Sequence, residues 1–293
     1  MRFTVHRHGT VDEFLAAAGS FLEAREAEHN LILGICSNVR AAPDRFVDEP
    51  PSFATVTDAA GRIVAATVRT PPHNQVLSWV ETPEAVEPLV ASLTGEPLPG
   101  VLGPTEPAER FARHWTDATG QPARIELAER IFRLERVIPP QRPATGSWRF
   151  GEPRDHELAL RWWLAFISEA MPLGPPPRDP EQVIARWLAS PNVWVYFWED
   201  GGEPVSMVGA SGETPHGVRI GPVYTPPELR GRGYASALTA TASQDQLDRG
   251  RDFVFLFTDL ANPTSNKIYR AIGYEPVCDV DMYRFGAEAE ADP

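Results

Sequence analysis

The sequence predicts a two-domain α/β protein of the mixed-sheet, α+β kind, in which each domain has a central, mostly antiparallel sheet flanked by helices. The 293 residues are more than one compact core usually needs and suit two domains of about 140 residues each. A cluster of breaker residues, Pro139-Pro-Gln-Arg-Pro-Ala-Thr-Gly146, falls near the midpoint. We therefore predict a domain at 1–138, a linker at 139–146, a second domain at 147–286 and a disordered acidic tail at 287–293.

The second half shows the clearer order of elements. A short strand is predicted at 147–150, and a helix at 155–170 because Leu158, Trp162 and Phe166 recur every four residues. The Asp200-Gly-Gly sequence marks a hairpin turn. The remaining predicted elements are a helix at 180–188, strands at 193–198, 204–210 and 218–224, a helix at 234–248, a strand at 253–257, a helix at 262–271 and a strand at 282–285.

The first half repeats this plan, which indicates a tandem duplication. It begins with a predicted strand at 3–6 and a long helix from Val11 into Gly34. A hairpin follows, with strands at 53–57 and 63–70. Late in each half the echo is strongest, since Gly103–Phe111 stands where the second half has Asn262–Tyr269, and Ile131-Phe-Arg-Leu134 matches Met282-Tyr-Arg-Phe285.

The amino-acid composition of the chain indicates which kinds of partner it can bind. The formal net charge of -13 is shared about equally by the two halves, so the field would repel a phosphate backbone and mildly favour a cationic amine. We therefore predict that nucleic acid is not a partner. Lys267 is the single lysine among many arginines, and together with 30 prolines this usage is typical of a GC-rich bacterial genome.

Cysteine and hydropathy patterns indicate the compartment. Cys36 and Cys278 lie far apart without metal-ligand spacing, so we expect free thiols, no metal and a reducing cytoplasm. No apolar run reaches the roughly 20 residues of a membrane span, and the start of the chain lacks the apolar core of a signal peptide. We expect a cytoplasmic protein with no membrane partner, as a monomer or homodimer.

The stretch from Val218 to Tyr274 carries the functional signal. An apolar strand leads into Arg230-Gly-Arg-Gly-Tyr-Ala235, and a helix follows. Gly231 and Gly233 let the backbone pass close to a ligand, and the helix turns its free N–H groups and positive dipole end toward the loop. Such a turn binds phosphates.

With its Arg-x-x-Gly-x-Ala pattern, and with Asn262, Ser265, Tyr269 and Gly273-Tyr274 downstream, this segment resembles the GCN5-related N-acetyltransferase (GNAT) superfamily. The resemblance covers about 147–285 and implies acetyl-CoA as cosubstrate. It assigns the loop backbone to the CoA pyrophosphate, with two arginines near its charges, and the end of the preceding strand to pantetheine and the thioester carbonyl, as an oxyanion-type contact. The cofactor-binding residues so implied are Val223, Tyr224, Arg230, Gly231, Arg232, Gly233, Tyr234, Ala235, Asn262 and Ser265.

Asn262 and Tyr269 each also have a purely structural explanation. Asn262 before Pro263 is explained fully as a helix N-cap followed by proline, although the resemblance also turns it toward pantetheine. Tyr269, two helical turns further on, is either a general acid for the departing thiolate or a half-buried core residue. For the general base the candidates are Glu213, which we take as the catalytic choice, His216 and Asp259.

The first half carries no equivalent loop. Where it should lie, the chain has Glu81, Glu84 and Glu87 without glycine, and such a loop would repel a pyrophosphate. We predict an N-acetyltransferase acting on a primary amine of a small molecule or peptide through its second domain, with a degenerate first copy that is structural or shapes the acceptor site. The alternatives are a non-catalytic acyl-CoA sensor or scaffold, and transfer of a longer acyl chain or to a hydroxyl.

Overall fold

The computed structural model describes residues 2–46, 49–170 and 178–286, which form two compact units. Met1–Arg130 and Cys278–Pro293 make the first unit, and Ile131–Val277 the second. Residues 139–146 are a loop, as predicted, yet the chain changes unit at 130/131 and again at 277/278. The predicted acidic tail at 287–293 lies outside the described residues.

The sheet of the first unit is mostly antiparallel. The β1–β2, β2–β3, β3–β4 and β5–β12 pairs are antiparallel, and β4 pairs with β5 in parallel. In spatial order the strands are β1 (Thr4–His8), β2 (Ser52–Thr57), β3 (Ile63–Arg69), β4 (Gln75–Leu77), β5 (Gly100–Pro104) and β12 (Glu275–Phe285).

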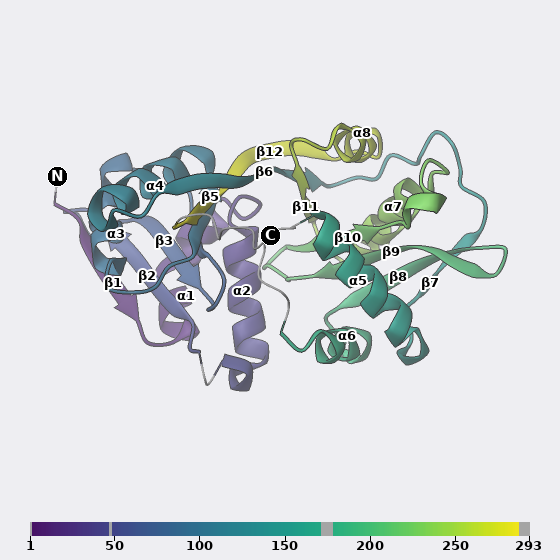
Figure 1. The fold of residues 1–293 in the computed structure, drawn as a ribbon, viewed down its shortest axis with the longest axis horizontal. Coiled ribbons are helices and arrows are strands. Elements are labelled where there is room, and N and C mark those ends of the chain that lie inside the picture. The colour runs from purple at the N-terminus through teal and green to yellow at the C-terminus, as the bar shows by residue number, and fades with distance from the viewer. Residues whose placement is uncertain (1, 47–48, 171–177, 287–293) are drawn as a thin grey trace, which may run out of the picture. The chain divides into compact units, whose positions relative to one another are not determined.

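Helices cover both faces of this sheet (Figure 1). Alternate residues of a strand point to opposite faces, so Phe53 of β2 packs with one pair of helices while Ala54 packs with the other. The first pair is α1 (Val11–Glu23) and α2 (Asn30–Ala41), and the second is α3 (Val86–Leu93) and α4 (Thr105–Thr119).

The predicted helix from Val11 into Gly34 is wrong in one respect, because it breaks between α1 and α2. Residues 24–29 form turns. The His29 side chain bonds the carbonyl oxygen of Leu22 at 2.9 Å, and the Asn30 side chain donates to the carbonyl of Ala27 at 2.7 Å. These side chains take backbone acceptors that would otherwise continue the helix.

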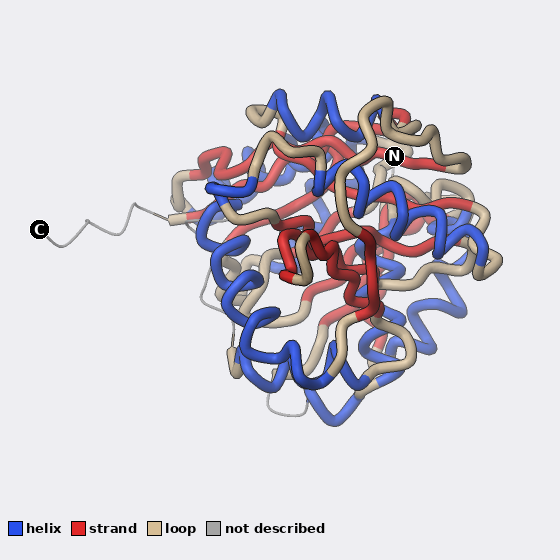
Figure 2. Tube along the Cα trace, turned by 90° about the vertical axis from the view of Figure 1, so that its right-hand side faces the viewer, coloured by secondary structure: helices blue, strands red, loops and turns tan. Residues whose placement is uncertain are grey.

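The second unit has the same three-layer plan. Its strands in spatial order are β6 (Ala123–Leu134), β11 (Phe253–Asp259), β10 (Gly217–Tyr224), β9 (Glu203–Ser211), β8 (Trp194–Asp200) and β7 (Ser147–Phe150). On one face lie α5 (His156–Ala170) and α6 (Pro180–Ala189), and on the other α7 (Tyr234–Asp248) and α8 (Pro263–Ala271). In Figure 2 the helices, in blue, pack outside the strands, in red.

The last strands of the two halves are exchanged between the units. The sequence predicts that Met282–Phe285 closes the second sheet, but β12 pairs with β5, with Met282 opposite Leu102. Phe285 packs on Phe111 and Trp115, at ring-centroid distances of 6.3 and 5.2 Å. The physical reason is that both halves end in equivalent strands, so either strand satisfies either sheet, as in domain swapping.

The end of the first half makes the reciprocal contribution. Phe132 and Leu134 of β6 are fully buried in the core of the second unit. The earlier part of β6 stays in the first unit, where Arg130 pairs with Asp279 at 2.6 Å and Glu126 with Arg284 at 2.6 Å, both on β12. Each half therefore completes its sheet with a strand from the other half.

Candidate active site

The Arg230–Ala235 loop has the backbone that its glycines predict. Gly231 and Gly233 adopt φ values of +80° and +86°, a region that side chains beyond glycine avoid. A side chain added at Gly231 would meet open space, with no heavy atom of the described chain within 4 Å. α7 starts at Tyr234, and no side chain of the described residues caps this end. Its first N–H groups thus face the loop, where they suit an anion.

The tyrosine and the linker hold this loop in place. Tyr234 is buried and its hydroxyl donates to the carboxylate of Asp200, which also accepts from Thr145 Oγ1 at 2.7 Å. These two hydrogen bonds hold the pKa of Asp200 below its usual range. Trp198 Nε1 donates to the Thr145 carbonyl at 2.7 Å. Because the Tyr234 side chain is used in this way, only its backbone N–H is left for a ligand, and the linker lies beside the loop.

The neighbouring strands separate at the same end of the sheet. The parallel pairing of β10 with β11 runs from Gly217 opposite Phe253 to Arg219 opposite Phe255. Beyond that pair both strands continue, to Tyr224 and Asp259, with no further register pair between them in the described chain. Their backbone groups are therefore available to an extended ligand lying between the strands.

A bulge in β10 accompanies this separation. Against β9, Ile220 is opposite Ala210 and Val223 is opposite Val208, so β10 carries one extra residue between these pairs. Gly221, at φ +145°, lies in the bulge. Bulges re-aim the backbone and are frequent next to active sites. Val223, which the sequence assigns to the ligand, follows the bulge directly.

The start of α8 lies after the end of β11 and carries the other predicted ligand residues. Asn262 Oδ1 accepts from the Ser265 N–H at 3.1 Å, so Asn262 is the N-cap that the sequence allows. Tyr269 is 8% exposed, and Ser265, one turn earlier on α8, partly offsets the effect of burial on the pKa of its phenol. Burial raises the pKa of Tyr269 to about 12, which keeps the phenol protonated at neutral pH. Its ring packs on Tyr274 at 5.9 Å, so the tyrosine is a core residue.

The three candidates for the general base lie in different places. Glu213 is held in an ion pair with Arg251 on the loop that precedes Gly217, which is the end of β10 remote from the Arg-Gly loop. His216 lies on the same loop. The structure thus brings neither of them to the separated strand ends. Asp259 ends β11 at the appropriate edge, and its carboxylate accepts from the Ala261 N–H at 2.7 Å.

Sequence reasoning missed Glu169. This residue lies in the last turn of α5, and its Oε2 accepts from Arg230 Nη2 at 2.6 Å. Burial raises the pKa of the Tyr224 phenol, and the negative charge of Glu169 adds to this shift. A signal was present in the sequence, because a carboxylate in the last turn opposes the helix dipole and does not serve the stability of the helix.

The corresponding place in the first unit is built differently. β5 stays close to β4, since a Cβ on Gly103 would lie 3.0 Å from the carbonyl oxygen of Leu77. The Trp79 N–H donates to His29 Nε2 at 3.0 Å, while His29 Nδ1 bonds the Leu22 carbonyl. Burial lowers the pKa of His29 to about 4. The neutral imidazole of His29 thus accepts the hydrogen bond from the Trp79 N–H, which is the backbone donor that follows β4.

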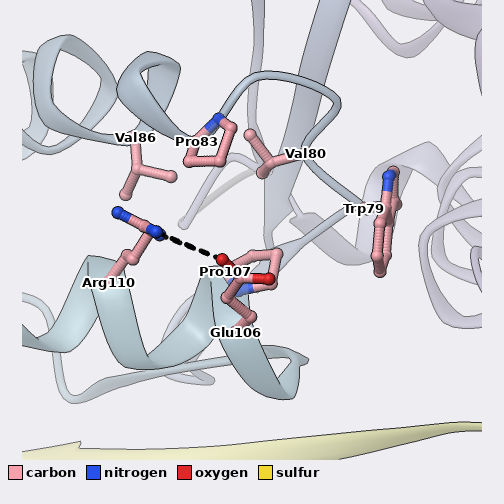
Figure 3. A pocket seen from close by; sticks show the side chains of 7 residues that line it. All are labelled: Trp79, Val80, Pro83, Val86, Glu106, Pro107 and Arg110. Carbon is pink, nitrogen blue, oxygen red and sulfur yellow. Dashed lines mark hydrogen bonds and ion pairs between the residues drawn. The ribbon is translucent and has the colours of Figure 1, made fainter.

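A small pocket of the first unit lies at the same position (Figure 3). Arg110 in it pairs with Glu106 one turn earlier on α4, at 3.2 Å. This pocket has neither a glycine loop nor a free helix N-terminus, because Pro83 and Ala85 lead directly into α3. The residues that line it are Trp79, Val80, Pro83, Val86, Glu106, Pro107 and Arg110.

Two searches of the described residues concern other kinds of site. No group of three or more His, Cys, Asp or Glu side chains suited to a metal ion is found among them. No helix within 2–46, 49–170 and 178–286 has the length and apolar character needed to cross a membrane.

A family model described as "Acetyltransferase (GNAT) family" matches residues 158–274. This segment contains the Arg-Gly loop, the separated strands and the start of α8. Residues 158–274 are therefore similar to the GNAT family, whose members use acyl-CoA for acyl transfer. A comparison with curated protein sequences finds no match.

Solved structures share the fold over both halves. A Drosophila protein of 13% identity has a TM-score of 0.69, covering 96% of this chain and 97% of its own. A GCN5-related N-acetyltransferase from Sphaerobacter thermophilus has 18% identity and a TM-score of 0.57, covering 97% of each chain. A tandem GNAT protein from the clavulanic acid biosynthesis pathway has 13% identity and a TM-score of 0.54, covering 97% of this chain and 98% of its own. The chain therefore has a tandem GNAT fold.

Proposed function

We propose that the second half of the chain binds acetyl-CoA and transfers its acetyl group to a primary amine of a small molecule or peptide. The observation that carries the proposal is that two features lie together at one end of the sheet of the second unit. There the glycine-rich, uncapped N-terminus of α7 lies next to the end of β10, where β10 and β11 separate. An anion site beside two unpaired strand ends suits a ligand with a diphosphate and an extended, amide-containing arm.

The donor contacts follow from this arrangement. The backbone N–H groups of Gly231 to Ala235 bind the pyrophosphate, with Arg230 and Arg232 beside its charges. Val223 and Tyr224 offer backbone groups to pantetheine, and a donor after the bulge polarises the thioester carbonyl. Asn262 and Ser265, at the start of α8, lie toward the same arm.

The reaction proceeds without a covalent enzyme intermediate. The neutral amine nitrogen attacks the thioester carbon, the carbon–sulfur bond breaks, and the amine proton passes to solvent or to a base at the strand ends. The Tyr269 hydroxyl donates a hydrogen bond or its proton to the departing thiolate, since its raised pKa keeps it protonated. Glu213 has no part in this proposal because its carboxylate is paired with Arg251 at the remote end of β10.

The first unit binds no CoA in this proposal. Its strands stay together at Gly103, and His29 already occupies the backbone donor after β4. Its role is structural or lies in shaping the acceptor site.

Calorimetric titration with CoA tests the binding, and release of free thiol from acetyl-CoA in the presence of a panel of primary amines tests the turnover. We expect one CoA per chain and amine-dependent thiol release. Binding without turnover by any amine would support a sensor, and turnover only with alcohols or longer acyl-CoA would change the acceptor or donor. Two CoA sites of similar affinity would contradict the assignment of the first unit.

A further inference from the structure

Glu169 and Arg230 form an ion pair at the edge of the proposed donor site. The guanidinium Nη2 lies 2.6 Å from Glu169 Oε2, while Nε donates to the Thr225 carbonyl at 2.9 Å. Arg230 is therefore anchored at one nitrogen and free to change partners at the others. It is also the first residue of the loop that receives the pyrophosphate in the proposed function.

The pair is placed to be exchanged easily. The side chains of Glu169 and Arg230 are 47% and 48% exposed, and ion pairs at such exposure contribute little to stability. A diphosphate carries more charge than a carboxylate and binds guanidinium with several oxygens. Once bound at the loop, it is the stronger partner for Arg230.

Glu169 also lies close to the end of β10. Its negative charge adds to the burial that raises the pKa of the Tyr224 phenol. Tyr224 in turn packs on Trp162 of α5, with ring centroids 6.1 Å apart. The carboxylate therefore lies near the end of β10, on the face covered by α5 and α6.

We infer that Arg230 exchanges Glu169 for the phosphates of the donor, and that the uncovered Glu169 carboxylate then binds the ammonium group of a cationic acceptor. This inference rests on the proposed function and names the acceptor class as an amine that is charged when it binds. It also couples the two ligands. Because coupling is reciprocal, the donor strengthens the binding of a cationic acceptor, and the acceptor strengthens the binding of the donor to the same degree.

The first test measures CoA affinity by calorimetry at low salt. Glu169→Gln removes the competitor for Arg230, so Kd for CoA should fall by about threefold to tenfold. Glu157→Gln, on the exposed first turn of the same helix, is the matched control and should leave Kd within about twofold. In an Arg230→Gln background, Glu169→Gln should no longer tighten binding, because the arginine that it frees is gone.

The outcomes separate this inference from the proposed function. A wild-type protein that binds no CoA overturns both. A wild-type protein that binds CoA, with Glu169→Gln indistinguishable from Glu157→Gln or weaker, overturns only the exchange. Thermal melts of each variant establish that they are folded.

The second test concerns the acceptor and uses an amine that the wild type acetylates, paired with the alcohol of the same carbon skeleton. Glu169→Gln should raise KM for the amine by at least about tenfold with kcat within about threefold, because a binding contact is lost and the chemical step is retained. Any turnover of the alcohol should be unaffected. An unchanged KM for the amine in Glu169→Gln would show that the acceptor binds elsewhere.

Discussion

The two halves of this chain share one plan and differ where a donor would bind. In the second half β10 has eight residues and β11 has seven, and both continue past their last shared pair. In the first half the corresponding strands, β4 and β5, have three and five residues. The strand ends that form the separated edge are thus shortened in the first half, and His29 bonds the backbone donor that remains.

The two halves therefore differ in strand length and in how much backbone is left unpaired at the sheet end. Packing is comparable in the two halves, since each has helices on both faces of its sheet and two buried clusters. What the first half lacks is backbone that is left unpaired at the sheet end and a helix that begins at glycine. Four experiments test this contrast.

The largest effect is expected at the loop. Gly231→Glu together with Gly233→Glu should abolish CoA binding, raising Kd by more than about 10²-fold, because both positions require positive φ and the new carboxylates face a polyanion. The matched control is Gly61→Glu with Gly250→Glu, which also combines positive φ with open space. Residual stoichiometric binding in the loop variant would place a CoA site in the first half.

The exchange of last strands is tested by Phe285→Ala. This side chain fills the core of the first unit against Trp115, so the free energy of unfolding should fall by about 3–5 kcal/mol. Hydrogen exchange should quicken first in β2 and β3. Ile125→Ala, at 54% exposure, should change stability by less than about 1 kcal/mol. Earlier loss of protection in β8 and β9 would contradict the pairing of β12 with β5.

His29 gives the first unit a defined sensitivity to acid. Its folded pKa of about 4 lies below the ordinary 6.5, so the unfolded state binds the proton more tightly and stability falls as pH drops from about 6.5 to about 4. The full loss amounts to about 3 kcal/mol at 1.36 kcal/mol for each pKa unit. Urea unfolding at pH 7 and pH 4.5 measures it.

The control for this acid effect is a pair of variants. His29→Gln should lower stability at pH 7 and flatten the dependence on pH, whereas His114→Gln, on α4, should retain it. An equally steep dependence in His29→Gln would assign the acid sensitivity to other groups.

Tyr269→Phe makes the second half resemble the first, which has Phe111 at the corresponding place. If the hydroxyl serves the leaving thiolate, kcat should fall by about 10²-fold with little change in CoA affinity. If the ring is only core, kcat should stay within about threefold and stability should fall by about 1 kcal/mol. With a pKa of about 12, the wild-type phenol should cause no decline of kcat below about pH 11. Measurements at saturating acetyl-CoA decide between the two.

Local sequence patterns predicted much of the fold and the backbone of the Arg230–Ala235 loop. The glycines at 231 and 233 and the apolar strand before them require a particular backbone, and that requirement is visible in the residues themselves. The N-cap at Asn262 was also predicted. The tandem repeat was recognised from Ile131–Leu134 and Met282–Phe285.

Because these two strands are so similar, the sequence did not reveal that they are exchanged between the units. An alternating strand pattern fixes which face of the strand is buried but leaves open which sheet the strand joins. The ion pair of Glu213 with Arg251 could not be predicted for a related reason, since Arg251 lies far along the chain. The turn at 24–29 depends on side chains that bond backbone carbonyls, which helical periodicity does not register. The pairing of Glu169 with Arg230 was missed because the two residues lie 61 positions apart in the chain.

The exchanged strands make the two copies depend on each other. Phe132 and Leu134 belong to the first half of the gene and lie in the core of the second unit. A deletion that removed the first half would therefore strip a strand from the half that holds the loop. Loss of the first copy as a whole would remove these buried side chains from the core of its neighbour, so neither copy keeps a complete core without the other once the strands have crossed.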